Sequence, residues 1–223
     1  MIELAGVSLV YQDHGKEVFA CRDIALDVRP GEFLGILGPS GSGKSSLLYL
    51  MSGLKVPTHG EVRYAGQSFS ARPLNQRDEI RLNEFGFVFQ HPFLVGYLTA
   101  LENVMLARPE GGDPEEAHAR LEELGLAAKV HRRPHELSGG ERQRVCVARA
   151  LMGSPRVIFA DEPTASLDHT NGLRVMEILA ANRGEGSLVV VTHDRTMLES
   201  ADRIVTIMDG QVAGITEQSP GDL

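Results

Sequence analysis

The stretch Phe33-Leu-Gly-Ile-Leu-Gly38-Pro-Ser-Gly-Ser-Gly-Lys44-Ser45 decides the fold class of this 223-residue chain. Its first five residues form a continuous apolar run, which is typical of a strand covered on both faces. A glycine-rich loop follows, and residues 43–52 then have helical character. Because a buried strand leads through a tight loop into a helix, the stretch predicts the βα unit of an α/β domain.

The same loop fits the pattern G-x-x-x-x-G-K-[ST], which needs a strand before it and a helix after it. Glycines let backbone N–H groups turn toward phosphate oxygens, and the helix N-terminus adds a partial positive charge. Lys44 is predicted to reach the β- and γ-phosphates and Ser45 Oγ to bind Mg²⁺. The alternative is a flexible turn with an exposed lysine, but a cation in the first helical turn costs about 0.3–1 kcal/mol unless an anion faces it. The predicted ATP-binding residues of the loop are Gly38, Pro39, Ser40, Gly41, Ser42, Gly43, Lys44, Ser45 and Ser46.

Two carboxylates follow a second apolar run. Val157-Ile-Phe-Ala160 leads into Asp161-Glu162-Pro163, and ligand sites in open α/β sheets lie at the carboxyl ends of strands. Successive residues point in different directions, so Asp161 is predicted to face a metal ion while Glu162 orients or deprotonates an attacking water. Taken alone, Asp-Glu-Pro is equally a solvated turn; together with the phosphate loop, the catalytic interpretation is favoured.

Composition and charge exclude several classes of protein. The net charge of −8 argues against a nucleic acid partner, which would need a basic surface. Cys21 and Cys146 have no CxxC spacing, so neither a disulfide framework nor a zinc site is expected, and a reducing cytoplasm fits. The N-terminus lacks the pattern of a signal peptide, and no run approaches the ~20 apolar residues of a membrane helix. A membrane role is therefore expected only through a partner.

The remaining pattern alternates between strands and helices, with a mainly helical middle third. Antiparallel strands are expected at the start, and the α/β rhythm returns after Leu137. The expected strands lie near residues 2–11, 24–28, 61–64, 85–89, 156–160 and 188–192. The expected helices lie near residues 100–107, 114–124, 139–152 and 170–182, and residues 216–223 are expected to be frayed.

Leu137-Ser-Gly-Gly-Glu-Arg-Gln-Arg144 resembles the signature motif of ABC ATPases, which other phosphate-loop enzymes lack. The resemblance covers nearly the whole chain up to about residue 215. It implies a P-loop NTPase fold of the ABC-ATPase type, with a mixed central sheet, an N-terminal antiparallel β subdomain and an inserted helical subdomain. Residues 1–223 would form one nucleotide-binding domain, with a RecA-like core at about 1–89 and 154–215 and the helical subdomain at about 90–153.

The resemblance also implies roles for residues outside the phosphate loop. Ser138, Gly139 and Gly140 open a helix and would form a second anion site, which in this family contacts ATP held by a second subunit. As isolated residues, a serine N-cap and a glycine turn would be the commoner interpretation. Asp168 would lie at the seam between subunits, a role compatible with capping the helix that follows.

Three further positions match family positions in order. Gln90 resembles the glutamine that contacts Mg²⁺ or water and senses the membrane partner, and His193 resembles the histidine that contacts the γ-phosphate. Tyr11 resembles the aromatic residue that stacks on adenine. The alternative for His193 is a structural histidine at the end of a strand. The alternative for Tyr11 is a strand tyrosine whose hydroxyl contacts water. Ser46 stands where threonine is usual. The expected catalytic residues are thus Glu162, His193 and Gln90, the metal ligands Ser45, Gln90 and Asp161, and the cofactors ATP and Mg²⁺.

The implied function is ATP hydrolysis by a pair of subunits that drives a separate membrane permease. The ATPase subunits of lipoprotein release, macrolide and peptide export, haem efflux and cell division are similar to this chain.

The permease's coupling helix would dock on residues 91–105, with Phe93, Leu94 and Tyr97 as exposed contacts or, alternatively, as core residues. The chain would lie at the cytoplasmic face of the cell membrane. A regulatory cell-division ATPase without cargo and a soluble ABC ATPase acting on DNA or ribosomes are the alternatives; the acidic charge and the absence of long insertions disfavour the latter.

Overall fold

The computed structural model describes residues 1–108 and 112–218. The chain falls into two compact units, one formed by Met1–Arg81 with residues from Val189 on, the other by Leu82–Leu188. Within the described residues, no helix has the length and apolar character needed to cross a membrane. The expected helical subdomain at about 90–153 stays a prediction.

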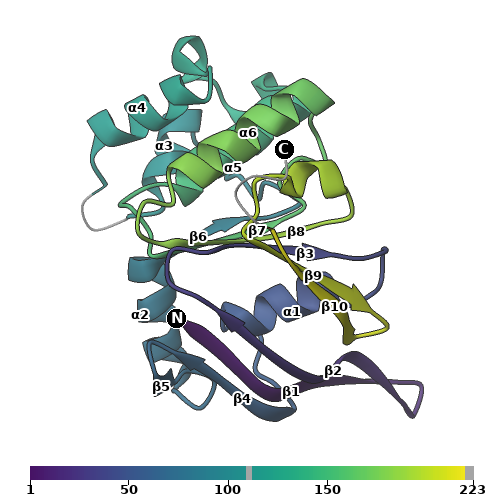
Figure 1. The fold of residues 1–223 in the computed structure, drawn as a ribbon. Helices are drawn as coiled ribbons and strands as arrows, with labels where there is room; N and C mark the ends of the chain where they lie inside the picture. The colour runs from purple at the N-terminus through teal and green to yellow at the C-terminus, as the bar shows by residue number, and fades with distance from the viewer. Residues whose placement is uncertain (109–111, 219–223) are drawn as a thin grey trace. The chain divides into compact units, whose positions relative to one another are not determined.

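An antiparallel sheet forms the first part of unit 1, as the alternating sequence predicts. Its strand order is β2-β1-β4-β5, and β1 and β2 form the long hairpin visible in Figure 1. Every second residue of β2 near its end, Ile24, Leu26 and Val28, is buried, which places one face of the sheet against the core. The strands are β1 (Ile2–Asp13), β2 (Lys16–Val28), β4 (His59–Tyr64) and β5 (Gln67–Ser68).

A mixed sheet forms the second part of unit 1. Strand β3 pairs parallel with β9, and β9 pairs antiparallel with β10. Helix α1 lies between this sheet and the antiparallel one (Figure 1), and Leu47, Leu48, Leu50 and Met51 of α1 are buried there. The elements are β3 (Phe33–Leu37), α1 (Lys44–Met51), η3 (Arg195–Leu198), β9 (Arg203–Met208) and β10 (Gln211–Glu217). Strand β8 (Ser187–Thr192) and helix α2 (Leu74–Glu84) each run across the boundary between the units.

Unit 2 packs helices against a pair of parallel strands (Figure 1). Its aromatic core holds Phe159 against Phe85, with ring centroids 5.2 Å apart, and against Phe87, at 5.7 Å. The strands are β6 (Phe85–Val88) and β7 (Val157–Asp161). The helices are α3 (Ala100–Met105), α4 (Pro114–Glu123), η1 (Ala127–Lys129), η2 (Pro134–Glu136), α5 (Gly139–Ala150) and α6 (His169–Ala181).

The ends of α4 follow from local sequence chemistry. The Asp113 side chain accepts a hydrogen bond from the Glu115 N–H, and Pro114 occupies the first helical turn, where its missing N–H costs nothing. Gly125 follows the helix with φ +73°, a left-handed conformation that terminates helices and favours glycine. The predicted start and end of this helix are confirmed.

Two features differ from the expectations. Thr216 and Glu217, expected to be frayed, pair with β9 as the end of β10, and Glu217 forms an ion pair with Arg29 at 2.8 Å. That pairing holds the strand beyond the point where the apolar pattern stops; residues 219–223 lie outside the described part of the chain. Helix α2 was not expected, because none of its residues is buried and it therefore has no apolar stripe for periodicity to reveal.

Candidate nucleotide site

The phosphate loop leaves β3 at Leu37 and enters α1 at Lys44, as its sequence predicts. Its glycines are required by close packing. A Cβ on Gly38 would lie 2.2 Å from the Ile207 carbonyl oxygen, and one on Gly43 would lie 2.1 Å from the Ala20 carbonyl oxygen. Gly43 also has φ +98°, which side chains rarely adopt. The loop is therefore held against β2 and β9 of its own unit in one backbone path.

The interior of the loop has the polar groups that a phosphate needs. Ser42 is buried, and no group in the described part of the chain makes a hydrogen bond to its Oγ. A buried hydroxyl without a partner costs about 1–3 kcal/mol, which a bound oxyanion would offset. Lys44 is only 6% exposed, and its Nζ donates to the Pro39 carbonyl at 2.8 Å, so the ammonium lies over the loop. Ser45 and Ser46 follow in the first turn of α1, both half-buried. The loop fits a phosphate chain.

The acid pair and Gln90 lie at one edge of the sheet in unit 2. Strands β6 and β7 are parallel, with Val88 opposite Ala160, so their carboxyl ends meet at the same edge. Gln90 follows two residues after Val88, and Glu162 follows two residues after Ala160. The structure therefore brings Gln90, Asp161 and Glu162 to the same sheet edge.

The backbone separates the two carboxylates. Asp161 ends β7 and is 2% exposed, whereas Glu162 is half-buried with φ +46°. A left-handed conformation is uncommon for glutamate, and its backbone strain of order 1–3 kcal/mol is characteristic of functional sites. The two residues thus differ in backbone conformation and in burial; their separate roles stay predictions. Among the described residues, no three His, Cys, Asp or Glu side chains gather to hold a metal ion by themselves.

The second predicted anion site is the start of α5. Ser138 is its N-cap and forms a capping box with Glu141: the Glu141 N–H donates to Ser138 Oγ at 3.2 Å, and the Ser138 N–H donates to Glu141 Oε2 at 2.9 Å. Lys129 Nζ hydrogen-bonds the Glu141 side chain, which lowers the pKa of that carboxyl. Ser138 is exposed and its hydroxyl hydrogen is not used by the box. The cap and the anion site are thus compatible.

Asp168 lies close to this helix start. A Cβ on Gly140 would lie 2.9 Å from Leu167 Cδ2, so α5 begins directly against the segment before Asp168. Asp168 caps α6, accepting from the Asn171 N–H at 3.0 Å and from Asn171 Nδ2 at 2.6 Å. The hydrogen bond from the Asn171 backbone is the largest cause that lowers the pKa of Asp168. The expected N-cap is confirmed; a role between subunits stays a prediction.

Tyr11 and His193 belong to unit 1 with the phosphate loop. Tyr11 lies in β1 with 42% of its surface exposed, and Lys55 Nζ lies 5.9 Å from its ring centroid. An exposed ring face suits stacking on a base as well as a strand position. His193 follows β8 and is exposed. Their contacts with a nucleotide stay predictions.

Two polar residues of α5 were missed by sequence reasoning. Gln143 is fully buried, and its Nε2 donates to the Phe89 carbonyl at 3.1 Å. Arg149 donates to the Pro92 carbonyl at 2.8 Å and to the Phe93 carbonyl at 3.0 Å. Gln143 lies four residues before the buried Val147 on the same helical face, which is the signal that could have found it. Through these bonds α5 holds the segment on both sides of Gln90.

The model of the ABC transporter family matches residues 21–165. The chain belongs to that family. As an ABC cassette it binds and hydrolyses ATP. It is 46% identical to the lipoprotein-releasing system ATP-binding protein LolD of Aquifex aeolicus, over 86% of this chain and 89% of that protein. It is 40% identical to the macrolide export ATP-binding/permease protein MacB of Nitrosomonas europaea, over the whole of this chain and 35% of that longer protein.

Solved structures agree with the cassette fold. The ATP-binding cassette MJ0796, solved as a dimer in a post-hydrolysis state bound to ADP and Pi, superposes with a TM-score of 0.92 at 35% identity, over 97% of this chain and 98% of that one. A second dimeric structure of MJ0796 gives the same TM-score at 36% identity. The predicted α/β cassette with an antiparallel N-terminal sheet and a mixed central sheet is therefore confirmed.

Replacement of the loop lysine is expected to weaken nucleotide binding by the cassette. Lys44→Ala removes the only ammonium placed over the phosphate loop in the described structure, and a charge-assisted hydrogen bond contributes about 1.5–3 kcal/mol. The ATP dissociation constant should rise by about 10- to 100-fold, measured by calorimetry. Lys16→Ala, at an exposed position of the same unit, is the control. ATP binding of unchanged affinity by Lys44→Ala would contradict the assignment of the loop.

Proposed function

We propose that two copies of the cassette pack with two-fold symmetry around two ATP molecules and drive a separate membrane permease. One observation carries this proposal: a single chain has two glycine-rich helix starts suited to binding phosphate, at Gly43 and at Ser138, in different units. The start of α5 is exposed and capped with a free hydroxyl hydrogen, which suits contact with a nucleotide on another copy. MJ0796 was solved as a dimer, which supports the pairing of two copies.

Within each composite site, residues of one copy would hold the nucleotide. Tyr11 would stack on the adenine, and the loop N–H groups with Lys44 would bind the phosphates. Ser45, Gln90 and Asp161 would hold Mg²⁺ together with phosphate oxygens and water, since this ion usually takes one or two carboxylates rather than an all-protein cage. When bound, the ion would neutralise charge on the phosphates. The second copy would contribute Ser138, Gly139 and Gly140, with Asp168 at the seam.

The hydrolytic step would depend on Glu162. Glu162 follows β7 with a left-handed backbone, and its carboxylate would orient the attacking water and accept its proton. His193, exposed after β8, would contact the γ-phosphate and stabilise its transferred charge. Gln90 would report the state of the site to the segment that follows it.

The segment after Gln90 is the proposed permease surface. Phe93 is 68% exposed and Tyr97 is 77% exposed, so the alternative that both fill the core is wrong; Leu94 is half-buried. Arg149 holds the backbone at residues 92–93, and the buried Asn103 side chain accepts from the Val95 N–H at 2.7 Å and donates to the Leu98 carbonyl at 3.2 Å. Exposed aromatic residues on a firmly held backbone are typical of a protein-binding surface.

The names of the relatives support one direction of transport. LolD, MacB and the pyoverdine export protein PvdT of Pseudomonas entomophila are 40–46% identical to this chain. These names support an export or extraction function, with the cassette attached through its permease to the cytoplasmic face of the membrane. The acidic net charge of −8 gives no support to a nucleic acid partner.

Removal of the two exposed aromatic residues is expected to release the permease. Tagged chain would be isolated in detergent from membranes of the cells that make it, and the complex mass measured by light scattering. The unaltered chain should co-purify as two copies with an integral membrane protein, whereas Phe93→Ser with Tyr97→Ser should lose the membrane protein and keep the ATPase activity of the isolated cassette. Leu74→Ser, which alters a residue 60% exposed on α2, is the control. Retention of the membrane protein by the double variant would place the docking surface elsewhere.

A further inference from the structure

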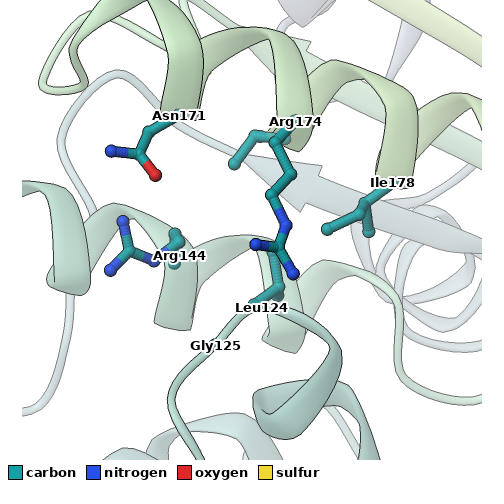
Figure 2. Close-up of a pocket in the computed structure, with 7 residues that line it drawn as sticks. Leu124, Gly125, Arg144, Asn171, Arg174 and Ile178 are labelled. Atoms are coloured by element: carbon teal, nitrogen blue, oxygen red, sulfur yellow. The ribbon is translucent and has the colours of Figure 1, made fainter.

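A pocket of about 170 Å³ lies between α4, α5 and α6 of unit 2, outside the residues assigned to ATP. It is lined by Leu124, Gly125, Arg144, Asn171, Arg174, Val175 and Ile178. Figure 2 shows Arg174 extending from α6 and Arg144 lying on the helix opposite, with the Asn171 amide near the Arg144 guanidinium. The charged lining is thus entirely cationic, and a leucine, a valine, an isoleucine, a glycine and an asparagine form the rest.

Neither arginine has an anionic partner in the described part of the chain. Within residues 1–108 and 112–218, no ion pair or hydrogen bond reaches the guanidinium of Arg144 or Arg174. The Arg144 Nε is fully buried without a partner, and such a donor is costly to leave unsatisfied. The chain carries 30 acidic residues against 22 basic ones, so a pocket with two unpaired guanidinium groups is not a consequence of excess positive charge.

Three acidic residues of the helices around the pocket have other partners, and a fourth makes no ion pair. Glu123, at the end of α4, lies 3.6 Å from Arg120 and accepts from Asn182 Nδ2 at 2.8 Å. Glu141 of α5 is held by Lys129 and Ser138. Asp168 at the start of α6 is held by Asn171. Glu177, on the same helix as Arg174, is exposed and makes no ion pair within 4.0 Å in the described chain. The counter-charge for the pocket is therefore not supplied by these groups.

We infer that this pocket binds a small tetrahedral oxyanion of the inorganic phosphate class. Donors from two helices line it, the guanidinium forks of Arg144 and Arg174, while the Asn171 amide nitrogen donates to Asp168. A carboxylate is saturated by one arginine fork, whereas a phosphate has oxygens for both. The volume accepts one such ion and excludes a whole nucleotide. Its apolar walls reduce solvent screening and so strengthen the charge interaction.

Binding of an oxyanion in this pocket would affect the residues that are proposed to face the second copy. Arg144 lies on the helix that Ser138 opens, about 9 Å along its axis. Asn171 holds Asp168 through two hydrogen bonds. An oxyanion bound to α5 and α6 together would thus fix the spacing of the two helices whose N-caps are Ser138 and Asp168. This step rests on the proposed dimer; binding of the oxyanion itself does not.

The test uses the full chain saturated with MgADP, so that the phosphate loop is occupied. Thermal unfolding is followed by circular dichroism, because the chain has no tryptophan. Sodium phosphate at ten times its dissociation constant should raise Tm by about 3–6 °C over sodium chloride of equal ionic strength. Sodium acetate should raise it less. The Arg144 Hε–Nε resonance should shift on phosphate titration, which a general salt effect would not cause.

Phosphate is excluded from protein surfaces and therefore stabilises folded proteins in general. Variants of the pocket separate this general effect from specific binding. Arg174→Gln, at an exposed position, should remove the rise in Tm, and Arg144→Lys should remove most of it. Arg156→Gln, which alters an exposed arginine of the same unit, should keep it. An equal rise in Arg174→Gln and Arg156→Gln would overturn the proposal, as would an Arg144 resonance that phosphate leaves unmoved. An acetate effect as large as that of phosphate, and lost in Arg174→Gln, would overturn the assignment to a tetrahedral ion.

Discussion

Glu162→Gln is expected to keep ATP binding, to lower the hydrolysis rate by about 10²–10⁴-fold and to accumulate a dimer in MgATP. The amide preserves the size of the side chain and the left-handed turn at this residue, but it cannot accept a proton from the attacking water. Because hydrolysis is the step that separates the proposed dimer, its loss should leave the two copies joined. Size-exclusion chromatography with light scattering measures the dimer, and phosphate release measures the rate.

The control for this variant must change charge without touching the site. Glu199→Gln removes the same charge at an exposed position of the other unit and should hydrolyse ATP normally. A Glu162→Gln protein with full activity would exclude Glu162 as the base. An inactive but monomeric one would leave the base assignment standing and contradict the proposal that ATP joins the two copies.

The phosphate loop and the acid pair could be predicted from the sequence because their chemistry is local. Gly38, Gly43 and Lys44 are fixed by spacing alone, and the structure gives each a steric or hydrogen-bonding reason: the two glycines have no room for a Cβ, and the lysine lies over the loop. Pro114 and Gly125 likewise mark the ends of α4 through properties of their own backbones. Where one residue's conformation decides the structure, the sequence is sufficient.

Features that depend on distant partners could not be predicted. Helix α2 has no buried face, so its helical pattern carries no apolar period. The end of β10 is held by its pairing with β9 and by the ion pair of Glu217 with Arg29, 188 residues apart in the chain. Arg149 is an ordinary surface residue in sequence terms and becomes structural only because carbonyls 56 and 57 residues away lie beside it. Contacts between residues so far apart in the chain leave no pattern in the local sequence.

Ser138→Arg is expected to block assembly of the dimer while leaving ATP binding by a single copy nearly intact. The long side chain would fill the anion site at the start of α5 and place its own cation there, where ATP on the other copy would need the space. The ATPase rate, which requires both halves of each composite site, should fall at least 10²-fold. Calorimetry on the monomer and light scattering in the Glu162→Gln background measure the two effects separately.

Loss of the helix cap must be separated from blocking of the site. Replacement of an N-cap serine costs about 1 kcal/mol of stability, so Ser138→Ala, which also loses the cap but adds no bulk, should still dimerise.

A mixture of Ser138→Arg and Lys44→Ala copies gives the sharper test. In a mixed pair, the intact phosphate loop of one copy meets the intact Ser138 of the other, so one composite site is restored. Because Ser138→Arg copies do not pair with one another, mixed pairs are favoured, and with one working site of two the activity should recover to at most roughly half of the unaltered level. A mixture no more active than its components would mean that each copy completes its own site, since only a site shared between copies can be repaired by mixing.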